Sequence, residues 1–179
     1  VSYGLQVARI AAQDQNVLSV TVNVRNRSVP SNASTAGCGW PLTYALKVPT
    51  TWASGLYYAV FGTGTKTCTV PFVVTAATRT AGANVLVQVP VTTAQAYNNY
   101  GGKSLYAYNS TSGIPAVKVS FDRPHSDPWN FAFDPWQAPF VRWLARNGFV
   151  ADFCTSVDLH ANASVLSGYR LFLTAGHDE

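Results

Sequence analysis

The pattern of apolar residues changes once along this chain, near residues 76–83, and this change limits the folds that the chain can adopt. Before it, apolar residues alternate with polar ones, as in Leu18, Val20, Val22 and Val24. After it, residues 85–89 form a short apolar run, and helix-like and strand-like segments follow each other. Alternation with period two is typical of half-buried strands, whereas an unbroken apolar run is typical of a strand buried on both faces. We therefore predict an all-β part at residues 1–78 and an α/β part at residues 79–179.

The first part contains several short segments with strand patterns. We expect strands near residues 18–24, 42–48, 56–61 and 68–75, and a hairpin turn at residues 62–65, where Gly62 and Gly64 alternate with threonine. Short strands at this spacing are typical of a small Ig-like β-sandwich.

The second part alternates strands and helices. Strands are expected at residues 85–89, 117–121, 150–154 and 169–174, with a helix at 137–147 that Gly148 ends and a helical turn at 162–167. Three prolines within residues 124–136 exclude a regular helix there and predict an ordered loop or lid. This order is typical of part of a doubly wound α/β domain. Because the chain stops just after a strand, we expect another chain or a missing segment to complete the sheet.

Composition favours a secreted globular protein. Hydrophobic residues make up 47% and charged residues only 11%, the formal net charge is +4, and methionine is missing. The basic residues are scattered, and no apolar run approaches bilayer length, so we expect neither a nucleic-acid partner nor a membrane. A chain that begins at Val1 without methionine indicates removal of a leader. Four sequons fit a secretory route and predict glycosylation at Asn26, Asn32, Asn109 and Asn162.

Three cysteines permit at most one internal disulfide. Cys38 and Cys68 flank two predicted strands and are the preferred pair, which leaves Cys154 over. Cys154 lies inside an apolar strand without a glycine elbow, so a thiol nucleophile is disfavoured. The sequence has no G-x-S-x-G motif, the P-loop pattern fails at Ala96, and no pair of cysteines or histidines has zinc spacing.

Two stretches remain as candidate functional segments. Residues 96–108, AYNNYGGKSLYAY, hold four tyrosines and a Gly-Gly pair after a buried strand; they form either a site or an ordinary surface loop. Residues 176–179, GHDE, follow the last predicted strand, and the carboxyl ends of strands are where sites form in such sheets. Carboxylate and phenolate oxygens are hard ligands that suit a ferric or another oxophilic ion.

Seven motifs in order resemble the N,N-dimethylformamidase large-subunit family. They are WASGLY at 52–57, AYNNYGGKSLY at 96–106, VSFDRP at 119–124, FVRWL at 140–144, TSVDLH at 155–160, LSGY at 166–169 and GHDE at 176–179. The resemblance is strongest from residue 85 onward. It implies an Ig-like β-domain followed by an amidotransferase-like α/β domain, and hydrolysis of a small amide by a mononuclear iron.

The resemblance also implies which residues hold the iron. Two tyrosines and one carboxylate map to Tyr57, Tyr97 and Glu179, with His177 beside them as an acid/base residue. Tyr57 is then expected to face the second domain, and Tyr58 the sandwich interior or solvent. The family domain continues beyond GHDE, so further pocket groups would come from another chain or be absent.

A second hypothesis is open at this point. The low charge, the exposed aromatic residues and the sequons also fit a secreted binding protein without enzymatic activity, such as a lectin-like or toxin-like two-chain protein that kept the fold.

Overall fold

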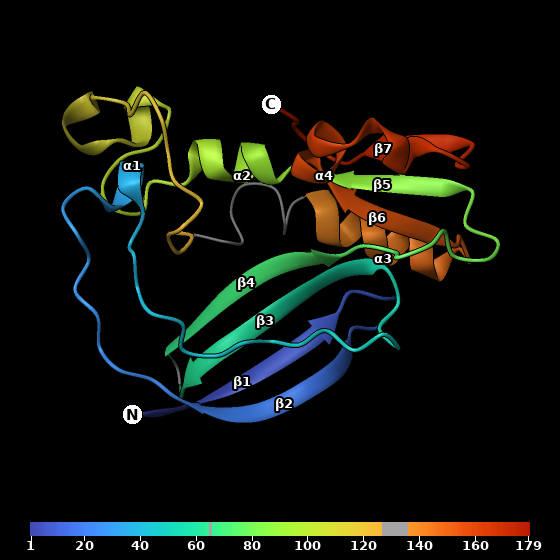
Figure 1. Cartoon of the computed structure of the whole chain (residues 1–179), viewed down its shortest axis with the longest axis horizontal. Coiled ribbons are helices and arrows are strands. Elements are labelled where there is room, and N and C mark those ends of the chain that lie inside the picture. The colour runs from blue at the N-terminus through green and yellow to red at the C-terminus, as the bar shows by residue number, and fades with distance from the viewer. Residues whose placement is uncertain (65, 127–135) are drawn as a thin grey trace.

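A computed structural model describes residues 1–64, 66–126 and 136–179. Its first part is an antiparallel sheet of four strands in the order β2-β1-β3-β4 (Figure 1). The strands are β1 (Ser2–Arg9), β2 (Gln15–Asn23), β3 (Gly55–Thr63) and β4 (Lys66–Val74). The sheet confirms the predicted strands near 18–24, 56–61 and 68–75, and β1 adds a strand that we had not predicted.

The prediction of a strand at residues 42–48 is wrong. This segment forms no strand, although Leu46 packs on the sheet beside Trp52. The other apolar side chains of the segment are exposed, with Leu42 at 81%, and its backbone pairs with no strand of the sheet. Alternation gives a segment one apolar side, whereas a strand also needs a partner backbone. Within the described residues, the first part is thus one sheet covered by irregular chain.

The second part is a parallel sheet of three strands in the order β6-β5-β7. The strands are β5 (Val85–Val89), β6 (Ala151–Thr155) and β7 (Leu171–Thr174). All five residues of the central strand β5 are buried, as its apolar run predicted. The predicted strand at 117–121 is not formed. Most of the predicted loop at 124–136 lies outside the described residues, which include only its ends at 124–126 and 136. A mixed fold of β and α/β parts is confirmed.

Helices and helical turns connect the strands. They are α1 (Ala33–Ala36), α2 (Val91–Tyr97), η1 (Ala107–Asn109), η2 (Thr111–Gly113), α3 (Ala138–Arg146), α4 (Ser156–Ala161) and η4 (Ala163–Leu166). Helix α3 ends where Gly148 takes a φ of +74°, and the Phe149 amide donates to the Leu144 carbonyl at 3.1 Å. This closure is the glycine stop expected from the sequence. No helix among the described residues is long and apolar enough to cross a bilayer.

One core cluster joins the two parts. Helix α3 lies between the two sheets and presents Val141 and Leu144 to both (Figure 1). Val87 and Phe153 meet it from the parallel sheet, and Leu56 meets it from β3. The turn that separates residues 1–78 from 79–179 therefore connects two sheets that share a hydrophobic core.

Candidate metal and hydrolase site

The segment after β7 is anchored to the start of α2. Gly176 takes a φ of +86° and turns the chain. The amide of Glu179 then donates to Thr93 Oγ1 at 2.7 Å, and the hydroxyl of Thr92 donates to the Glu179 carbonyl at 2.9 Å. From the buried strand β5, Gln88 Nε2 donates to Asp178 Oδ2 at 2.6 Å. The carboxyl ends of β5 and β7 thus fix residues 178 and 179 in place.

Four side chains converge at this point. The Tyr106 hydroxyl donates to Glu179 Oε1, and His177 Nε2 lies 3.4 Å from the same oxygen. The rings of Tyr97 and Tyr106 stack with centroids 4.3 Å apart, and the His177 ring meets the edge of Tyr97 at 5.9 Å. We call Tyr97, Tyr106, His177 and Glu179 the tyrosine–glutamate cluster. The structure therefore brings Tyr97, His177 and Glu179 together, as expected.

Tyr106 is the member that we missed from the sequence. It lies nine residues after Tyr97, and the intervening loop folds back so that the two phenols meet. The hydrogen bond to Glu179 raises the pKa of Tyr106 far above its ordinary value, and the hydrogen bond to Tyr97 adds to this rise. Without a cation, the cluster therefore keeps Tyr106 protonated. Its position in the GGKSLY motif was the available signal, because that motif had already been singled out.

Arg123 holds the loop that places Tyr106. Its buried guanidinium donates to the carbonyls of Gln95, Tyr100 and Lys103, at 3.2, 2.8 and 3.0 Å respectively. Gly101 takes a φ of +81°, and a Cβ there would lie 2.7 Å from the Ser34 amide nitrogen. The Gly-Gly pair is thus needed for a tight turn against α1.

Asn109, a predicted glycosylation site, supports the same loop. Its side-chain nitrogen donates to the Tyr97 carbonyl at 2.9 Å, and its side-chain oxygen accepts from the Ser104 hydroxyl. A glycan on that nitrogen would compete with the first of these bonds. Asn26, Asn32 and Asn162 are exposed and could accept a glycan, and glycosylation at these residues stays a prediction.

The expected orientation of Tyr57 is wrong. Tyr57 is 1% exposed and stacks between Trp52 and Phe72, on the face of the sheet turned away from α3. Its hydroxyl donates to the Ala53 carbonyl at 2.7 Å, and burial raises its pKa. Tyr58 instead packs against the shared core. Alternation along β3 requires Tyr57 and Tyr58 to face opposite sides of the sheet. Stacking of one tyrosine between Trp52 and Phe72 decides that Tyr57 faces away from α3. Tyr57 is therefore not part of the cluster.

The expected Cys38–Cys68 disulfide is not formed. Cys38, Cys68 and Cys154 are free thiols. The Cys38 amide donates to the Asp122 carbonyl at 2.6 Å in the loop after α1, whereas Cys68 lies in the β4 ladder opposite Phe61. Each cysteine is thus positioned by its own backbone partners, which sequence spacing does not reveal. Burial raises the pKa of Cys154 to about 11, which agrees with our rejection of it as a nucleophile.

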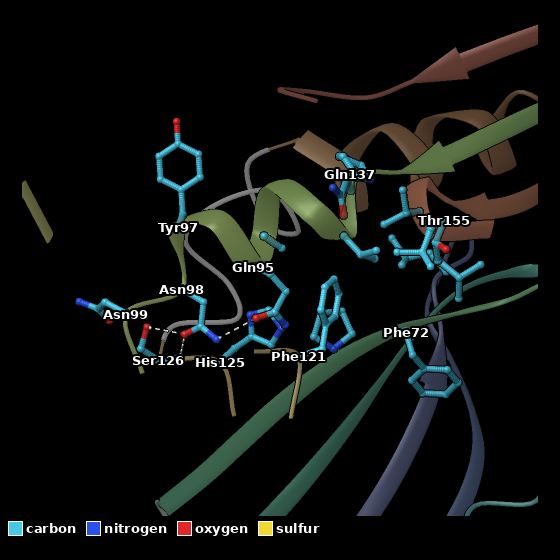
Figure 2. A pocket seen from close by; sticks show the side chains of 18 of the residues that line it. Phe72, Gln95, Tyr97, Asn98, Asn99, Phe121, His125, Ser126, Gln137 and Thr155 are labelled. Atoms are coloured by element: carbon cyan, nitrogen blue, oxygen red, sulfur yellow. Dashed lines mark hydrogen bonds between the residues drawn. The ribbon is translucent and has the colours of Figure 1, made fainter. Parts of the chain in front are cut away.

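A cavity of about 670 Å³ lies under α2, between that helix and β4. Figure 2 shows Gln95, Asn98 and His125 at its wall, and Tyr97 pointing away from them. No described residue that lines it is an Asp, Glu, Lys or Arg. Burial lowers the pKa of His125, so its ring is neutral at pH 7. Gln95 Oε1 accepts from Asn98, so Gln95 Nε2 donates to His125 Nε2 at 3.0 Å. The cavity suits an uncharged molecule.

The chain matches the model of one protein family, described as N,N-dimethylformamidase beta subunit-like, C-terminal. The match spans residues 3–179. The chain belongs to this family. The match confirms the resemblance that the seven motifs indicated, and the family is named after a hydrolase subunit. No curated protein sequence matches the chain.

The donor atoms of this family member fit a hard cation. The tyrosine–glutamate cluster supplies two phenol oxygens, a carboxylate and an imidazole within contact of one another. No group of three His, Cys, Asp or Glu side chains that could hold a metal occurs within residues 1–64, 66–126 and 136–179. A metal site in the described part of the chain would therefore depend on the tyrosines, and oxygen donors of this kind favour a ferric ion over zinc.

Proposed function

We propose that the chain carries the iron site of a hydrolase that cleaves a small, uncharged amide. The convergence of Tyr97, Tyr106 and Glu179 beside His177 is the observation that carries this proposal. Family membership supports a hydrolase, and the neutral cavity under α2 supports an uncharged substrate. Tyr97, Tyr106 and Glu179 would hold the ion, with Tyr106 in the role that the family resemblance implied for Tyr57.

Bound iron would supply a Lewis acid that polarises an amide carbonyl and acidifies a water molecule. The chain itself supplies the proton transfers. His177 is 52% exposed at its side chain and reaches Glu179 Oε1 at 3.4 Å, so it can accept a proton from an attacking water and return it to the departing amine. The anchoring of residues 178 and 179 by Gln88, Thr92 and Thr93 keeps this carboxylate and imidazole at the strand ends.

The experiment is metal loading followed by an amide assay. Protein loaded with ferric iron should show the visible charge-transfer band of tyrosinate, and, once assembled with the second polypeptide proposed below, it should release dimethylamine from N,N-dimethylformamide. Tyr97→Phe and Tyr106→Phe should each lose most of that band, and His177→Gln should keep iron but lose at least about 100-fold in rate. Tyr100→Phe is a matched control, since Tyr100 lies in the same loop and its ring packs against Trp40. Iron binding that survives both phenylalanine variants would refute the assignment.

We further propose that a second polypeptide completes the α/β part and makes the protein active. In the described residues, β7 pairs only with β5, and its other edge is open. Leu171 and Phe172 on this strand are 48% and 39% exposed. The family description names a beta subunit, which fits assembly with another chain. Sedimentation of the natural protein should reveal a partner; a fully active lone chain would contradict this proposal.

We also infer that the two parts correspond to an Ig-like β-domain and an amidotransferase-like α/β domain. Leu46 and Trp52, which pack on the core cluster of the four-stranded sheet, support the first assignment, and the β6-β5-β7 order with α3 on one face supports the second. An experimental structure of the complete assembly would test both.

A further inference from the structure

A second cavity, of about 410 Å³, lies far from the tyrosine–glutamate cluster. Phe149, Val150 and Ala151, at the start of β6, form part of its wall. The strands β5, β6 and β7 are parallel, and the cluster follows the end of β7. The cavity and the cluster are therefore at opposite ends of one sheet. The rest of the cavity wall comes from the end of β1 and the two residues after it, from the two residues before β3, from Thr80, and from α3 with Gly148 after it.

The one charged group in this wall is the guanidinium of Arg9. All other described residues that line the cavity are apolar, except Ser54 and Thr80. Arg9 Nη2 donates to the Ser54 carbonyl at 3.2 Å, and Nε is buried without a partner. No other hydrogen bond or ion pair joins this side chain to the described residues. Arginine presents five N–H donors, so this guanidinium has further donors that a ligand could accept from.

The side chain of Arg9 lies over Gly55 at the start of β3. It continues the face of β1 that carries Leu5 and Val7, and it lies opposite Tyr57 on β3. A Cβ at Gly55 would lie 3.0 Å from Arg9 Nε, so the missing side chain makes room for the guanidinium. Arg9 as a whole is partly exposed, but its Nε is buried without a partner, and a bound anion would supply one.

The carboxylates near this cavity already have partners. Asp152 accepts two hydrogen bonds from Thr80 of the wall and one from Tyr169. Asp14, three residues after Ala11 of the wall, is paired with Arg142 at 2.7 Å. Arg146 Nε donates to the Ala12 carbonyl at 3.3 Å and adds a second cation to this side of the molecule. The carbonyls at the end of α3 do not compete for Arg9, because the amides of Asn147, Gly148 and Phe149 already donate to them.

We propose that this cavity binds a small monocarboxylate with a short apolar chain. The carboxylate would accept hydrogen bonds from the Arg9 guanidinium, whose fork matches carboxylate geometry. The chain would pack among Leu144, Phe149 and Phe153. This site is independent of the iron site, so either proposal can fail without the other.

The test is an NMR titration of the isotope-labelled protein with butyrate. Saturable shifts of the Phe149, Ala151 and Phe153 amides are expected, with a dissociation constant on the order of 1 mM. Butyramide has the same shape without the charge, and it should bind at least about tenfold more weakly. The absence of saturable shifts, or equal shifts with butyramide, would overturn the proposal.

Two variants connect the binding to this cavity. Arg9→Gln should abolish the shifts, whereas Arg25→Gln, which removes the same charge from an exposed position, should leave them unchanged. Ala145→Leu, at the end of α3 in the cavity wall, should block the chain of the ligand without unfolding the protein. Binding that survives both Arg9→Gln and Ala145→Leu, or that Arg25→Gln weakens equally, would also overturn it.

Discussion

Tyr57→Phe separates a structural tyrosine from a metal-binding one. The substitution keeps the ring stacked between Trp52 and Phe72 and removes only the hydroxyl, which donates to the Ala53 carbonyl at 2.7 Å. One such hydrogen bond contributes about 1 kcal/mol to the free energy of unfolding. For a chain of this length, we expect the melting temperature to fall by about 2–4 °C. Iron content and the tyrosinate band should stay as in the wild type.

The assay combines urea unfolding, followed by circular dichroism, with elemental analysis of the same samples. Tyr58→Phe is the neighbouring control, because its hydroxyl donates to the exposed Asp14 and should contribute less than that of Tyr57. Tyr106→Phe should show the opposite result, with near-normal stability and a lost band. A folded Tyr57→Phe protein that binds no iron would refute the reasoning and restore Tyr57 as a ligand.

Three further predictions concern the framework. Asp152→Asn should lower the free energy of unfolding by about 3 kcal/mol in urea, because the buried carboxylate accepts two bonds from Thr80 and one from Tyr169; a loss under about 1 kcal/mol would contradict this. Burial lowers the pKa of His125, so the neutral ring stabilises the fold fully above about pH 6.5. As pH falls below this value, the free energy of unfolding should decrease by at most about 1.4 kcal/mol per pH unit. His125→Asn should flatten this dependence of stability on pH. Gly101→Ala should cost at least about 2 kcal/mol, since its Cβ would meet the Ser34 amide, whereas Gly113→Ala, with open space, should cost about 1 kcal/mol; equal melting temperatures would contradict the contact.

Local sequence patterns predicted the fold correctly where the structure of a segment depends mainly on its own residues. The run at β5 is buried along its whole length, and Gly148 ends α3 as expected. The pattern failed at residues 42–48 and 117–121, which have strand-like alternation but no backbone partner. It also missed α2, because the threonines and alanines of Val91–Tyr97 form no apolar stripe.

The candidate site was likewise predicted only in part from the sequence. Two segments, 96–108 and 176–179, were identified from residue types alone, since tyrosines and carboxylates are conspicuous after apolar strands. The sequence could not show that Tyr106, rather than Tyr57, meets Glu179. That choice depends on the Gly101 turn and on Arg123, which binds three carbonyls of the loop.

The sequence by itself determined the order of the parts, the family and the chemical character of the cluster, because period, motif and donor type are local properties of the chain. Only the tertiary structure decided which side of β3 Tyr57 faces, that Cys38 and Cys68 are not bonded to each other, and that Arg9 lines an apolar cavity with its Nε unpaired. The physical reason is that each of these depends on contacts between residues far apart in the chain, and such contacts form only when the two sheets close around α3.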